Sequence, residues 1–148
     1  MAVVGITPED AVDNFAILAA LAGKGAELAT ARITPEELRD LRALAAAIGE
    51  SDDVVAANRH FHRAINLAAR SPRLLTYVRQ AQRVVPGNYF ELFPEQEQRS
   101  RREHAALLDA MECGDGSAAR RLMEAHVLSA GEALGTWLAK TAQEPRGY

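Results

Sequence analysis

The segment NRHFH, residues 58–62, contains two of the four histidines of this 148-residue chain. Asn58 and His62 are four residues apart, so on a helix their side chains project from one face, one turn apart. An amide oxygen and an imidazole nitrogen at this spacing can serve as two ligands of one metal ion. A histidine on a helix is also commonly a hydrogen-bonded core or surface residue. The spacing alone therefore leaves both interpretations open, and His60 is expected to point elsewhere.

The remaining histidines flank a turn signal, the segment GDG at 114–116. His104 precedes this segment by as many residues as His126 follows it. If the flanking segments are antiparallel helices joined by this turn, the two imidazoles face each other at one level. If the helix face that carries Asn58 and His62 points to the same level, three imidazoles and one amide oxygen converge inside the protein.

Such a cluster suggests a site for a divalent metal. Zinc and nickel favour imidazole nitrogen, and a shell of three histidines with positions left open can accept a ligand or activate water. A metalloenzyme would also need a general base near the open position. Glu103 and Glu124 lie near the histidines in sequence but off their helix faces, so both are expected to point outward. The sequence contains no HExxH, nucleophile elbow, phosphate loop or CxxC motif.

Helix-start signals recur along the chain, and few segments between them resemble a strand. TPEE at 34–37 combines an N-cap threonine, a first-turn proline and the glutamate of a capping box, and TPED at 7–10 repeats this pattern less completely. Further starts are expected at Ser51, Ser71, Phe93 and Gly114. Apolar residues between these points recur at helical spacing. The predicted fold is all-α, an antiparallel bundle of six to seven helices with a central metal and ligand cavity.

Composition narrows the possible partners and compartment. A net charge of -3 disfavours an extended basic surface for nucleic acid, and a single cysteine excludes an internal disulfide. The chain has no apolar run of the length that spans a bilayer, and its first residues lack the basic region of a signal peptide. We therefore expect a cytoplasmic protein without a membrane partner.

Two segments carry a family resemblance, ANRHFHRAINLAARSPRL at 57–74 and REHAALLDAMECGDGSAARRLMEAHV at 102–127. In this order they resemble the FCD domain, the C-terminal effector-binding domain of the FadR subfamily of GntR transcription regulators. The resemblance spans roughly residues 9 to 140. It predicts a helical domain at 9–142 between an N-terminal tail at 1–8 and a C-terminal tail at 143–148.

The resemblance implies a bacterial ligand-sensing domain, not an enzyme, that binds a small carboxylate metabolite at a divalent metal, with zinc or nickel the expected ions. Carried over residue by residue, the metal ligands are Asn58, His62, His104 and His126. Many family members have aspartate in place of Asn58. The neutral amide should weaken metal binding and strengthen the attraction for an anionic effector. The first helix also lacks the acidic residue expected near Ala22, so effector preference does not transfer.

The resemblance also implies a homodimer. Family members bind DNA through an N-terminal winged helix-turn-helix, which this sequence lacks. The expectation is therefore either an excised effector domain or a stand-alone sensor. Candidate partners for the effector carboxylate, which the sequence does not rank, are Arg63, Arg73, Arg79 and Arg83. The alternative is a stand-alone metal-dependent enzyme acting on a small carboxylate, and a third possibility is a structural helical module whose histidines bind nothing.

Overall fold

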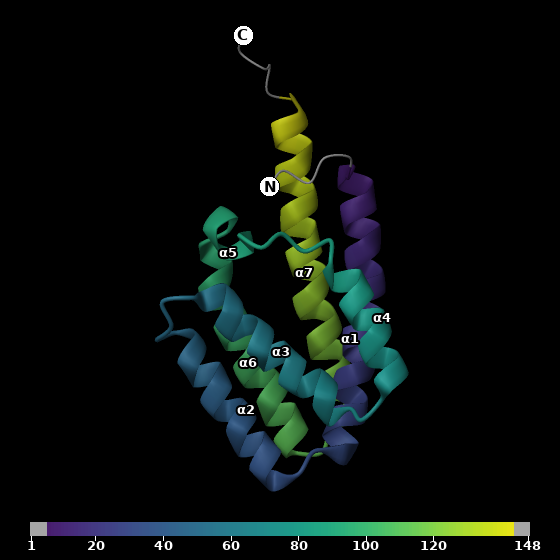
Figure 1. Ribbon diagram of the computed structural model, residues 1–148, viewed down its shortest axis with the longest axis vertical. Helices are drawn as coiled ribbons and strands as arrows, with labels where there is room; N and C mark the ends of the chain where they lie inside the picture. The colour runs from purple at the N-terminus through teal and green to yellow at the C-terminus, as the bar shows by residue number, and fades with distance from the viewer. Residues whose placement is uncertain (1–5, 144–148) are drawn as a thin grey trace.

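A computed structural model describes residues 6–143, and this part of the chain is a bundle of seven helices without strands (Figure 1). The all-α prediction is confirmed. In chain order the helices are α1 (Pro8–Arg32), α2 (Pro35–Ile48), α3 (Val54–Ala68), α4 (Pro72–Gln82), α5 (Tyr89–Leu92), α6 (Glu95–Glu112) and α7 (Gly116–Gln143). Helices α1 and α7 each extend one residue beyond the predicted domain at 9–142, and the outer parts of both predicted tails lie outside the described residues.

Capping boxes open α1 and α2, as the TPED and TPEE segments predict. The Thr34 hydroxyl accepts a hydrogen bond from the Glu37 amide at 3.2 Å, and the Glu37 carboxylate accepts one from the Thr34 amide at 2.9 Å. Thr7 and Asp10 form the same reciprocal pair. The shorter aspartate thus completes the box as fully as glutamate does, and both helices begin at a proline that has no amide hydrogen to satisfy.

Two helices begin later than the sequence signals indicate. The hydroxyl of Ser51 accepts a hydrogen bond from the amide of Asp53, and Asp53 then caps α3 by accepting one from the Ala56 amide. The serine therefore closes a turn that leads into the helix. Helix α6 begins at Glu95, after Pro94, and has no side-chain cap. The aromatic segment before it forms the single turn α5, with Tyr89 and Phe93 buried against the core.

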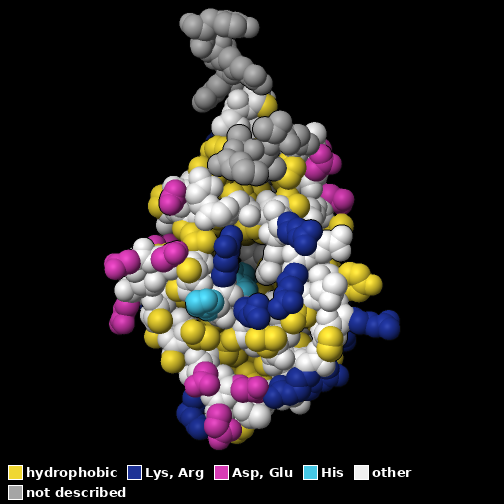
Figure 2. All heavy atoms as spheres, in the orientation of Figure 1, with side chains coloured by type: hydrophobic (Ala, Val, Ile, Leu, Met, Phe, Trp, Pro, Cys, Tyr) yellow, Lys and Arg dark blue, Asp and Glu magenta, His cyan; other side chains and the backbone are white. Residues whose placement is uncertain are grey.

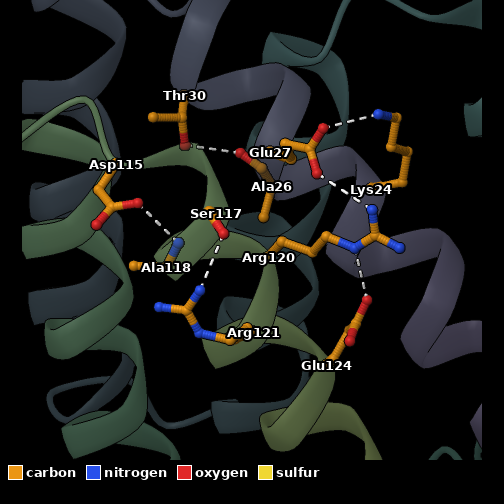
Figure 3. A network of polar contacts seen from close by, with 10 residues as sticks. All are labelled: Lys24, Ala26, Glu27, Thr30, Asp115, Ser117, Ala118, Arg120, Arg121 and Glu124. Carbon is orange, nitrogen blue, oxygen red and sulfur yellow. Dashed lines mark hydrogen bonds and ion pairs between the residues drawn. The ribbon is translucent and has the colours of Figure 1, made fainter.

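The turn between α6 and α7 sets the register of these two helices. Gly114 adopts a left-handed conformation (φ 71°), and the amide of Asp115 donates to the carbonyl of Ala110, which closes the end of α6. The Asp115 carboxylate then accepts a hydrogen bond from the Ala118 amide at 2.9 Å and caps α7 (Figure 3). This turn makes α6 and α7 an antiparallel hairpin and brings His104 opposite His126.

Helices α1 and α7 run side by side in opposite directions over most of their length (Figure 1). Two glycines of α7 permit the close approach. A Cβ atom on Gly131 would lie 2.4 Å from the Cβ of Phe15, and one on Gly135 would lie 2.7 Å from a methyl group of Val12. At the other end of the pair, Arg120 bridges Glu27 and Glu124 at the exposed surface (Figure 3). Exposed ion pairs contribute little, so glycine-mediated contact dominates this interface.

We expect Gly131→Ala to destabilise the protein. The new methyl group overlaps the Cβ of Phe15, a buried atom next to the backbone, and overpacking of this kind costs about 1–3 kcal/mol, offset in part by the better helix propensity of alanine. Urea unfolding of the purified chain measures the difference. Gly87→Ala is the control, because nothing lies within 4 Å of a Cβ atom at that position. Equal stability of the two variants would contradict the close α1–α7 contact.

Candidate metal and ligand site

Three histidines from three helices converge in the interior. The Nε2 atom of His126 on α7 lies 3.3 Å from Nε2 of His104 on α6 and 3.3 Å from Nε2 of His62 on α3. The candidate ligand atoms of all three residues lie within 4.8 Å of one another. The predicted convergence of the three imidazoles is therefore confirmed, and it includes the match of His104 with His126 across the hairpin. His60 is exposed and lies outside the cluster.

Phe61, the residue before His62 on α3, helps to position the histidines of the cluster. Its side chain is fully buried and stacks on the ring of His104, with 4.2 Å between the ring centroids. The adjacent residue, His62, therefore lies at the boundary of the core, where its ring is nearly parallel to that of His126. The apolar contact of Phe61 thus orients one histidine directly and the other through the helix backbone.

Burial keeps two of the imidazoles neutral. Desolvation, with a further contribution from His126, lowers the pKa of His62 from 6.5 to about 3. The pKa of His104 is also lowered, first by burial and then by the charges of His62 and His126. Neutral imidazoles retain the lone pairs that a metal ion requires, so at pH 7 these two rings need not lose a proton before they coordinate a metal.

Glu103 points into the site, and the expectation that it points outward is wrong. Its Oε2 atom lies 2.6 Å from Nδ1 of His126, while its Oε1 atom accepts a hydrogen bond from Arg99 at 2.7 Å. Burial alone would raise the pKa of Glu103, but the hydrogen bonds from His126 and Arg99 lower it. When Nδ1 of His126 donates to this carboxylate, Nε2 keeps its lone pair for the cluster. Glu124 behaves as expected and pairs with Arg120 away from the histidines.

Asn58 lies one turn before His62 on α3, and both residues line a cavity beside the histidine cluster. Its side-chain oxygen is buried and has no hydrogen-bond partner among the described residues. A buried polar atom without a partner is costly, because desolvation is not offset by a new hydrogen bond. An oxygen with a free lone pair, on the cavity wall that His62 and His126 also line, is suited to a metal ligand.

The donor set fits a divalent metal ion. Tetrahedral coordination at a metal–nitrogen distance of about 2.1 Å places the nitrogens about 3.4 Å apart. Both separations at Nε2 of His126, 3.3 Å each, agree with this value. The ligand atoms of all three histidines lie within 4.8 Å of one another, so an ion bound by all three rings would draw His62 and His104 together.

A cavity of about 140 Å³ adjoins the cluster and is lined by residues of α1, α3, α6 and α7 and of the segment from α4 to α5. Asn58, His62, Glu103 and His126 all contribute to its wall. On the face of the molecule in Figure 2, Lys and Arg side chains surround a hollow in which histidine is visible. The bundle thus combines a candidate metal centre with space for a small molecule beside it.

The arginine that lines the cavity is not one of the four that the sequence suggested as partners of the effector carboxylate. Arg63, Arg73, Arg79 and Arg83 are exposed, and none of them lines the cavity. Arg59 does line it, next to Asn58 on α3. Its position directly after Asn58 could have indicated that Arg59 lies near the site. Helical periodicity, however, does not show how far a long side chain extends around a helix.

A family model described as the FCD domain matches residues 13–129. The chain belongs to the FCD domain family. FCD domains are the C-terminal effector-binding domains of GntR-family regulators. The matched segment contains Asn58 and the three clustered histidines and is somewhat shorter than the predicted domain. No significant match is found among curated proteins. In the described part of this FCD domain, no helix has the length and apolar character needed to cross a membrane.

The lowered histidine pKa values predict a pH-dependent stability for the metal-free protein. Between pH 6.5 and about 3 the unfolded chain binds a proton at His62 that the folded chain does not. The free energy of unfolding should therefore fall as the pH falls through this range and be independent of this group above pH 6.5. His62→Ala should reduce the slope by about 1.4 kcal/mol per pH unit.

This slope is measured by urea unfolding at several pH values in the presence of a chelator. His60→Ala is the control, because His60 is exposed and lies two residues away on the same helix. An unchanged slope in His62→Ala would show that His62 does not titrate differently in the folded and unfolded states.

Proposed function

We propose that this FCD domain is the ligand-sensing domain of a GntR-type transcription regulator of the FadR subfamily. It binds a small organic acid at a divalent metal, zinc or nickel, held by His62, His104, His126 and, more weakly, Asn58. The observation that carries this proposal is the convergence of three imidazole nitrogens at the wall of a cavity inside a domain of an effector-binding family.

Each residue of the site has a separate task in this proposal. The three imidazoles and the Asn58 oxygen are neutral donors, and Glu103 fixes the orientation of His126 from behind. A bound metal ion would supply positive charge to which an anionic effector is attracted. Arg59 on the cavity wall is placed to pair with the effector carboxylate.

Because several helices surround the cavity, ligand binding can change how these helices are arranged. Its wall combines α1, α3, α6, α7 and the segment that joins α4 to α5. A ligand that contacts all of them stabilises one arrangement of the helices over others, which is the differential affinity that a switch requires. DNA binding would belong to a separate domain. Dimerisation of this domain and a cytoplasmic location remain predictions.

A metal-dependent enzyme acting on a small carboxylate is the alternative function. Glu103 reaches the cavity and is the residue that could act as a general base there. However, both of its oxygens are engaged, one by His126 and the other by Arg99, and its pKa is lowered. A carboxylate held in this way is better suited to orienting a ligand than to accepting a proton, so the sensor is favoured.

Calorimetric titration of the metal-free chain with zinc should show one site per chain. His62→Ala should weaken zinc binding by at least about 100-fold, because it removes a direct ligand. His60→Ala, the same substitution two residues away, should bind zinc like the parent protein. Equal affinities of both variants would contradict the assignment of His62.

Asn58→Asp tests the fourth ligand. The aspartate should lower the stability of the metal-free protein, since it buries a carboxylate beside an unpartnered position. It should also tighten zinc binding by about tenfold or more, because the carboxylate adds a negative charge to the shell. Thermal unfolding with and without zinc measures both effects. Unchanged or weaker zinc affinity would place Asn58 outside the ligand shell.

A further inference from the structure

The cavity wall has two chemically different parts. One part, which we call the metal end, carries Asn58, His62, His126 and Arg59 on α3 and α7. The other, which we call the apolar end, is formed by α1 and by the segment from α4 to α5. Its apolar members are Phe15, Leu18, Ala22, Val85, Pro86 and Phe90. A molecule anchored by a charged group at the metal end can therefore contact this apolar surface with its body.

Positive charge is confined to the metal end. Among the described residues that line the cavity, Arg59 is the only Lys or Arg. The Lys and Arg side chains around the hollow in Figure 2 attract anions toward its mouth. The apolar end therefore offers no cationic partner for a second carboxylate.

The other polar groups of the cavity wall are uncharged or already engaged. The uncharged ones include Asn66, Gln82, Gln96, Ser100 and Ser129. The Tyr89 hydroxyl contacts the carbonyl of Ala130 at 3.4 Å, and burial raises the pKa of Tyr89 to about 12, so its ring presents an uncharged surface. The carboxylate of Glu103 is paired with Arg99 and His126. A second negative charge in the ligand would lose its hydration here without an opposite charge to replace it.

From this asymmetry we propose that the effector is a small monocarboxylate with an apolar body, and that dicarboxylates and polyanionic acids are disfavoured. This inference rests on the proposed function, because it assumes that the carboxylate is held at the metal end. The cavity volume of about 140 Å³ suits a body such as a short chain or a single small ring. Val85 and the other residues of the apolar end then determine specificity by contacting the body of the ligand.

The test compares three acids on the zinc-loaded protein by calorimetry. Acetate supplies the carboxylate alone, hexanoate adds an apolar chain, and succinate has as many non-hydrogen atoms as hexanoate but a second charge. Hexanoate should bind about 10- to 100-fold more tightly than acetate, because each buried methylene adds several-fold in affinity. It should also bind more tightly than succinate.

Val85→Asn identifies the surface that is responsible. It should remove most of the preference for hexanoate over acetate while leaving acetate affinity unchanged, which also shows that the variant is folded. The matched control is Val84→Asn, since Val84 is the preceding residue and does not line the cavity. This control should retain the preference for hexanoate.

The outcomes separate this inference from the proposed function. Succinate binding as tightly as hexanoate, or an unchanged preference in Val85→Asn, overturns the apolar specificity but leaves carboxylate sensing at a metal intact. Absence of binding by all three acids to the zinc-loaded protein overturns both. A preference for hexanoate that is lost in Val85→Asn and kept in Val84→Asn supports both.

Discussion

Three imidazole nitrogens directed at one point inside a helical bundle constrain every helix that carries them. His62, His104 and His126 come from α3, α6 and α7, and the two Nε2 contacts at His126 are 3.3 Å each. A small rotation or translation of any of these helices would separate the nitrogens or drive the rings together. The cluster therefore requires a well-packed scaffold, and Phe61 stacked on His104 and the closed turn at Gly114 supply two of the needed restraints.

Desolvation makes the same cluster costly to the protein and useful to a ligand. Burial holds the pKa of His62 near 3, far below its ordinary value, and the Asn58 oxygen has no hydrogen-bond partner in the described part of the chain. Groups buried in this state lower the stability of the metal-free fold and are available to an ion that binds them. A metal ion that binds only the folded protein raises its free energy of unfolding by mass action. Binding can therefore offset the stability that the metal-free site costs.

The close contact of α1 with α7 gives the cavity its opposite wall. Gly131 allows Phe15 to approach the backbone of α7, which places α1 near the histidine cluster. Phe15 and Leu18 then face the cavity. The pairing links the metal centre on one side to an apolar surface on the other, so a ligand between them contacts both parts of the bundle. This arrangement suits a sensor, in which binding energy is used to select one helix arrangement.

The sequence by itself determined the helical architecture and the opposition of His104 and His126 across the hairpin. Capping boxes at Thr7 and Thr34, the turn at Gly114 and the equal spacing of His104 and His126 from that turn are local signals, and they depend on the short-range hydrogen bonding and periodicity of single helices. Only the tertiary structure decided that Glu103 turns inward to His126, and that Arg59 reaches the cavity while Arg63, Arg73, Arg79 and Arg83 do not. The physical reason is that the direction and reach of a long side chain depend on the rotation of neighbouring helices and on the partners they present. These are set by packing between segments distant in the chain.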